Sequence, residues 1–129
     1  MKFFLSIILI CFNLYVYSQS FTENDLKKIA QEINDEAKDT NYGNGITLKR
    51  CFALNRTLIY QYEVGKYWDP PVNIKEDLIA KFNKAGDAEI FFNNDINADF
   101  CYYSGNKLLK RVCIKSKEFS NAFGPSFER

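Results

Sequence analysis

Residues 55–71, NRTLIYQYEVGKYWDPP, decide the fold that this sequence predicts. From Thr57 onward the side chains alternate between two faces, a period of two that is typical of a β-strand. The larger apolar side chains share one of these faces, and they are Leu58, Tyr60, Tyr62 and Val64. The strand must end near Gly65, because the two prolines that follow cannot donate hydrogen bonds to a sheet. We therefore expect a strand whose tyrosine face packs on a helix.

The preceding run, ITLKRCFA at 46–53, alternates in the same way and predicts a partner strand. A polar turn near 54–56 separates the two runs, which is typical of a β-hairpin. Unbroken alternation puts one set of side chains on one face: Ile46, Leu48, Arg50 and Phe52. It puts the remaining side chains on the opposite face: Thr47, Lys49, Cys51 and Ala53.

Amphipathic helices are predicted on both sides of this hairpin. Residues 21–38 carry apolar side chains at helical spacing, namely Leu26, Ile29, Ala30, Ile33 and Ala37, with Thr22 as the capping residue. Residues 73–85 repeat the pattern, and Gly86 ends it. The next segment, AEIFFNN at 88–94, predicts a short third helix, with a strand over EIFF as the alternative.

A second hairpin is predicted over 96–103 and 107–114, joined through a turn that contains Gly105 and Asn106. On its last strand, Leu108, Val112 and Ile114 are expected to face inward. The segment 117–129 contains Phe119, Phe123 and Phe127, but Gly-Pro at 124–125 prevents a continuous helix. We expect a loosely docked C-terminal tail there.

These elements predict an α+β fold. The order is an N-terminal helix, a β-hairpin, one or two helices and a second β-hairpin, so a four-stranded sheet carries helices on one face. The domain is expected to span 21–116. The sequence does not specify the order of the strands or the oligomeric state.

The first 18 residues predict a signal peptide, since Lys2 precedes an apolar run that is shorter than a membrane span. Retention of this segment as an anchor is the alternative. A periplasmic or secreted protein follows, with no membrane association after cleavage. Removing Lys2 leaves 16 basic and 16 acidic side chains, a balance that does not favour nucleic acid as a partner.

Three cysteines follow the predicted signal: Cys51, Cys101 and Cys113. Export to an oxidising compartment favours a disulfide. Alternation places all three on the sheet face away from the helices, so we expect Cys51 to pair with Cys101 or Cys113. The chain has no histidine and no close pair of cysteines, so we expect neither a metal site nor a cofactor.

Three segments resemble a family of small exported bacterial domains of uncharacterised function. They are LNRTLIYQYEV at 54–64, INADFCYYSGNKLLKRVCI at 96–114, and the short helix that ends in NND at 93–95. Members carry an N-T-L-x-Y-x-Y strand after a helix, and they end in a G-x-x-x-x-Y-x-Y strand and a D-x-x-G-K turn. This sequence inserts Arg56 in the first motif, has Asp95 in place of the glycine and Ser-Gly-Asn-Lys in the turn. The resemblance covers most of 22–115 and implies a bacterial, periplasmic α+β domain without an assigned activity.

Enzymatic activity is not expected. Without histidine, the usual serine and cysteine triads lack their base. The paired carboxylates of Asp95 and Asp99 and of Glu76 and Asp77 fit a solvated strand and a helix start better than glycosidic chemistry. No glycine-rich phosphate loop is present.

The loop 65–73 is the predicted binding site for a protein or cell-envelope partner, through Tyr67, Trp68, Asp69, Pro70 and Pro71. The alternative role of Trp68 is to fold back over the core. A second hypothesis is an apolar-ligand pocket between helix and sheet, lined by Tyr60, Tyr62, Phe82, Phe100 and Tyr102. A third is a secreted inhibitor or effector whose Trp68 loop enters a cleft of its target. The sequence does not identify the ligand or partner.

Overall fold

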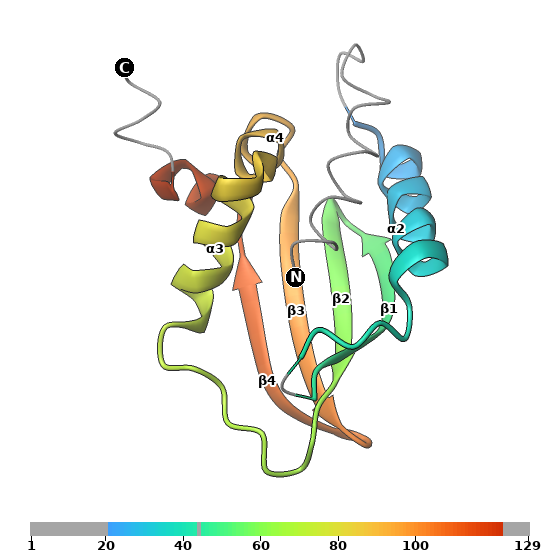
Figure 1. The fold of residues 1–129 in the computed structure, drawn as a ribbon. Helices are drawn as coiled ribbons and strands as arrows, with labels where there is room; N and C mark the ends of the chain where they lie inside the picture. Colours follow the sequence, from blue (N-terminus) through green and yellow to red (C-terminus); the bar gives the residue numbers. More distant parts are fainter. Residues whose placement is uncertain (1–20, 44, 123–129) are drawn as a thin grey trace.

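The computed structural model describes residues 21–43 and 45–122 of this chain (Figure 1). The predicted signal peptide, Phe123 and Phe127 lie outside the described residues. The helices are α2 (Glu23–Ala37), α3 (Ile74–Ala85), α4 (Asp87–Asn93) and the 3-10 helix η1 (Ser116–Ala122). The strands are β1 (Thr47–Leu54), β2 (Thr57–Glu63), β3 (Asn97–Ser104) and β4 (Lys107–Ile114).

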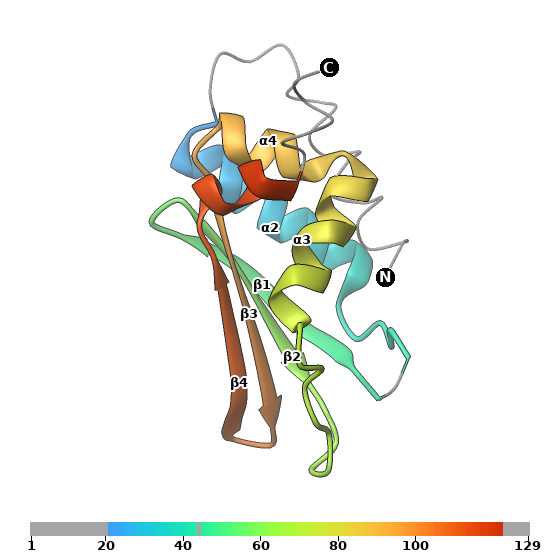
Figure 2. The same ribbon diagram turned by 90° about the vertical axis from the view of Figure 1, so that its left-hand side faces the viewer.

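The four strands form one mixed sheet in the order β1-β2-β3-β4. Each hairpin is antiparallel, whereas the central strands β2 and β3 run parallel. The connection through α3 and α4 supplies the long crossover that a parallel pair requires. The described helices, α2, α3, α4 and η1, lie on the same side of the sheet (Figure 2), which confirms the α+β prediction.

The covered face of the sheet carries the predicted tyrosines into the core. Tyr60 is fully buried and Tyr62 is 6% exposed, so the inward orientation of this face is confirmed. Burial of each such side chain is worth about 1.5–3 kcal/mol. Thr22 also caps α2 as predicted: its hydroxyl accepts from the Asp25 amide at 3.1 Å, and the Asp25 carboxylate accepts from the Thr22 amide at 2.9 Å.

The short helix between the two hairpins is real, and the strand alternative for EIFF is wrong. Gly86 ends α3 with φ 88°, a left-handed conformation that glycine adopts without strain, and α4 begins at the next residue. Phe91 of α4 is fully buried, while Phe92 is 36% exposed and remains at the surface.

Two β-bulges change the faces that simple alternation predicts. In β1 the register shifts between Leu48 and Arg50, so Cys51 lies opposite Tyr60 on the covered face. In β4 the register shifts opposite Tyr102 and Tyr103, so Leu108 pairs with Tyr103 on the open face. The predicted inward positions of Arg50, Phe52 and Leu108 are therefore wrong, as is the outward position of Cys51.

The predicted tail begins as part of the core. Phe119 of η1 is fully buried against Phe82 and Phe91, with ring centroids 5.6 and 5.1 Å apart. The Ser116 hydroxyl donates to Asp95 at 2.8 Å and fixes the start of η1. The packed domain therefore extends beyond residue 116.

Arg56 ties the turn of the first hairpin to the helical layer. It occupies a left-handed conformation (φ 61°), as does Asn55. Its guanidinium donates to the backbone carbonyls of Phe21 and Asn94, and its amide donates to the Glu23 carboxylate at 3.1 Å. This arginine thus joins the start of α2 to the end of α4.

Candidate functional site

A column of five aromatic rings crosses the covered face of the sheet. The parallel register places Tyr60 beside Phe100 and Tyr62 beside Tyr102. Centroid distances along the column are 4.8 Å for Tyr60–Phe100, 6.4 Å for Phe100–Tyr62, 5.1 Å for Tyr62–Tyr102 and 4.9 Å for Tyr102–Trp68. All four pairs are stacked, an arrangement that adds about 0.5–1.5 kcal/mol per pair to the burial energy. The column therefore runs from the core to the β2–α3 loop, where Trp68 ends it.

The predicted binding loop is divided by this contact. Trp68 is half-buried because its ring stacks on Tyr102, so it folds back on the end of the core. Tyr67 remains 85% exposed, and Val72, which sequence reasoning did not single out, is 97% exposed. Asp69 and Pro71 are exposed and Pro70 is half-buried. In this loop the Trp68 ring is therefore held against the core, whereas Tyr67 and Val72 are exposed to solvent.

A groove of about 310 Å³ lies between this loop and α3, and we call it the Trp68 groove. It is lined by Ile46, Trp68, Asp69, Pro71, Ile74, Asp77, Leu78, Lys81 and Tyr102. It joins the predicted loop residues Trp68, Asp69 and Pro71 to Tyr102, which the sequence assigned to a separate pocket. The α3 residues were missed because apolar helix positions such as Ile74 are indistinguishable in sequence from core positions.

The other residues of the predicted apolar pocket lie within the packed core. Tyr60, Phe82 and Phe100 are each at most 1% exposed, and Phe82 meets Phe100 edge-on at 5.8 Å. Burial raises the pKa of Tyr60 and of Tyr62 well above the ordinary value. These phenols therefore remain neutral at physiological pH, and only Tyr102 of the set reaches the Trp68 groove.

The cysteines do not form the predicted bridge. Cys51, Cys101 and Cys113 are free thiols, and Cys51 lies on the covered face while the other two lie on the open face. The bulge in β1 is the physical reason, because it reverses the alternation on which the pairing depended. Burial raises the pKa of all three thiols, most strongly that of Cys51.

We expect three titratable thiols in a chain that begins at Gln19, unfolded in guanidinium without reductant. In the native protein, Cys113 should react first with a thiol reagent, since Cys51 and Cys101 are 1% and 7% exposed. Cys113→Ser should remove this fast phase, whereas Cys51→Ser should leave it unchanged. A count of one thiol in guanidinium would contradict the three free thiols and would show that two of the cysteines form a disulfide.

Of the four carboxylates considered for chemistry, Asp95 and Asp99 have structural partners, Asp77 lines the Trp68 groove, and Glu76 is exposed at the start of α3. Asp99 accepts from Arg111 at 2.7 Å, and Asp95 accepts from Ser116. Within residues 21–43 and 45–122, no cluster of histidine, cysteine and acidic side chains fits a metal ion. No helix in the same described part of the chain has the length and apolar character of a membrane span.

Comparison of the whole sequence and fold with known proteins adds no assignment. No protein-family model matches this chain, and neither a curated protein nor a solved structure is significantly similar to it.

Proposed function

We propose that this chain is a non-enzymatic exported domain that binds a protein of the cell envelope or of the extracellular space through the Trp68 groove. The observation that carries this proposal is the groove itself, which lies open beside two exposed apolar side chains, Tyr67 and Val72. The proposal includes export, which the predicted signal peptide supports, and membership of the bacterial family, which the sequence resemblance supports.

The aromatic column makes the floor of the groove rigid. Trp68 stacks on Tyr102, which stacks on Tyr62 in the core, so the loop is held before any partner arrives. A preorganised surface loses less conformational entropy on association. Tyrosine and tryptophan next to a small pocket are also the residues that most often dominate binding energy at interfaces.

The charges of the groove indicate what kind of segment would fit. Asp69 and Asp77 contribute two carboxylates and Lys81 contributes one ammonium group. A partner segment with an apolar anchor beside a basic side chain would complement this lining. An inhibitor or effector would use the same loop, so that hypothesis differs only in the target.

A photo-crosslinking residue in place of Tyr67 tests the proposal. We expect a specific protein adduct in envelope extracts, and none from the same residue in place of Leu54, which is 55% exposed on β1. Unlabelled protein should compete for the adduct, and Val72→Asp should compete at least tenfold less well. Equal adducts at positions 67 and 54, or equal competition by Val72→Asp, would contradict the proposal.

A small apolar ligand is the second candidate, because about 310 Å³ is at the lower end of the range for ligand pockets. Trp68 is the only tryptophan of the chain, so its fluorescence reports directly on this groove. Quenching of Trp68 by an apolar dye, together with the absence of a protein adduct, would favour this candidate.

A further inference from the structure

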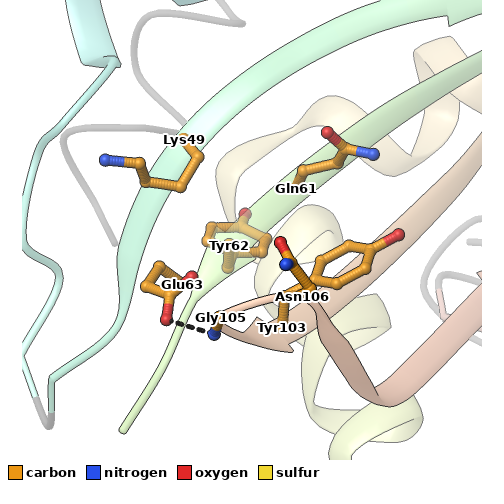
Figure 3. Close-up of a pocket in the computed structure, with 7 residues that line it drawn as sticks. All are labelled: Lys49, Gln61, Tyr62, Glu63, Tyr103, Gly105 and Asn106. Carbon is orange, nitrogen blue, oxygen red and sulfur yellow. Dashed lines mark hydrogen bonds between the residues drawn. The ribbon is translucent and has the colours of Figure 1, made fainter.

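A second depression, of about 350 Å³, lies on the open face of the sheet, away from the helices and the Trp68 groove. We call it the open-face depression (Figure 3). Its lining residues come from β1, β2, β3 and the β3–β4 turn, and they are Lys49, Gln61, Glu63, Tyr103, Gly105 and Asn106, together with Tyr62, whose ring stacks on the covered face. No motif or spacing in the sequence points to this surface.

Strand register and one hydrogen bond organise the depression. Glu63 pairs with Tyr103 across β2 and β3, so their side chains share the open face. The Glu63 carboxylate accepts from the Gly105 amide at 2.8 Å, which joins the end of β2 to the β3–β4 turn. Gly105 has φ 62°, a conformation that favours glycine in this tight turn.

Several polar groups in the depression have unused hydrogen-bonding capacity. Gln61 is oriented because its carbonyl oxygen accepts from Arg50 Nε at 2.8 Å. In the described part of the chain, no hydrogen bond engages the amide nitrogen of Gln61, the Tyr103 hydroxyl or the Asn106 side chain. Figure 3 shows these three side chains around the same hollow, with Lys49 set apart on β1.

The chemistry of the lining suits a neutral, hydroxyl-rich ligand. Lys49 is paired with Asp39 at 3.0 Å, so its ammonium group is not free for an anion, and the Glu63 carboxylate, which accepts from the neutral Gly105 amide, would repel one. An apolar ligand would remove water from the amides and the hydroxyl without replacing their hydrogen bonds. The ring of Tyr103 nevertheless offers one apolar surface among these polar groups.

We propose that the open-face depression binds a neutral saccharide. The Tyr103 ring packs against the C–H face of one sugar ring, and the sugar hydroxyls hydrogen-bond to Gln61, Asn106 and the second carboxylate oxygen of Glu63. A volume of about 350 Å³ fits a short saccharide rather than a large cofactor. This site is independent of the Trp68 groove and does not require the partner proposed for it.

Titration of the full chain, followed by amide NMR shifts, tests this site with defined sugars. The probes are cellobiose, maltose and N,N′-diacetylchitobiose, with sorbitol as a polyol that has hydroxyls but no ring. We expect at least one disaccharide to shift the amides of Tyr103, Gly105 and Asn106 with a Kd on the order of 1 mM. Sorbitol should cause no shift of these amide signals.

Variants separate binding from folding. Tyr103→Ala should weaken saccharide binding by about tenfold, and Asn106→Ala, in an exposed turn, should weaken it by about threefold with the fold intact. Tyr67→Ala is the matched control, because it removes an exposed tyrosine that lies outside the open-face depression and should leave the affinity unchanged. Three results would overturn the proposal: no shift up to about 50 mM of any disaccharide, equal shifts with sorbitol, or unchanged affinity in both variants of the depression.

Discussion

Replacement of Phe119 by alanine is expected to lower the free energy of unfolding by about 3–5 kcal/mol. Phe119 is fully buried in η1 and packs on Phe82 and Phe91, so its removal leaves a cavity between η1, α3 and α4. In a domain of this size, such a loss corresponds to a fall in Tm of more than about 12 °C. Urea unfolding, monitored by circular dichroism, measures this loss of stability.

Tyr67→Ala provides the control for this measurement. It also removes an aromatic ring, but one that is 85% exposed, so a change within about 0.5 kcal/mol is expected. If Phe119→Ala does not fold, Phe119→Leu should still fold at a cost of less than about 1.5 kcal/mol. A loss below about 1 kcal/mol for Phe119→Ala would mean that η1 detaches freely, as the tail prediction assumed.

The sequence pattern predicted Phe119 in a loosely docked tail rather than in the core, and this error has a physical reason. The Gly-Pro at 124–125, which lies outside the described residues, argues against a continuous helix over the tail, but it says nothing about a short 3-10 helix that ends before it. Since a helix of this kind needs few residues, no periodicity reveals it. The partly buried Ser116–Asp95 hydrogen bond and the Lys75–Glu118 ion pair at 2.6 Å, which hold η1, link positions far apart in the sequence.

The helices, strands and inward tyrosines were predictable because they depend on local periodicity, whereas the bulges interrupt it. The signal of each bulge was nevertheless present. Lys49 and Arg50 are adjacent charged residues within a strand, and strict alternation put Arg50 in the core. Leu108 and Leu109 likewise break the alternation of β4. A charged residue at a core position should therefore have indicated a bulge, and with it the true face of Cys51.

The sites were only partly predictable. The unusual Trp-Asp-Pro-Pro corner marked the loop, but the groove depends on how α3 packs beside Tyr102. The open-face depression depends on the parallel pairing of β2 with β3, and strand order is a long-range property that hairpin patterns do not specify. Nothing local distinguishes Gln61 or Asn106 from ordinary surface residues.

We expect the native protein to lose stability as the pH rises towards neutrality, and we expect Asp87→Asn to abolish this loss. Asp87 is fully buried at the start of α4, and neither carboxylate oxygen has a hydrogen-bond partner among the described residues. Burial raises the pKa of this carboxyl from 3.8 to about 7. The charged form is therefore disfavoured in the folded state, since an isolated buried charge is costly.

The sign of the effect follows from this raised pKa. The folded state retains the proton up to about pH 7 while the unfolded state releases it near pH 4, so stability falls as the pH rises between these values. Between about pH 5 and pH 8 the native protein should lose on the order of 2–3 kcal/mol. The pKa values of three other acids, Asp25, Asp39 and Glu118, are lowered. Their protonation therefore reduces the stability as the pH falls, which is the opposite direction, and it does so at lower pH.

Urea unfolding of both proteins at several pH values in this window gives the measurement. The side-chain amide that Asp87→Asn introduces is neutral throughout, so any cost of burying it moves the whole curve and leaves its slope flat. At about pH 8 the variant should be the more stable protein, because only the native chain then carries a buried charge. Glu36→Gln, on the exposed side of α2, is the matched control and should reproduce the native slope. Parallel curves for the native protein and Asp87→Asn would show that Asp87 is ionised in the fold and has a compensating partner, since a group with equal pKa in both states contributes no pH dependence.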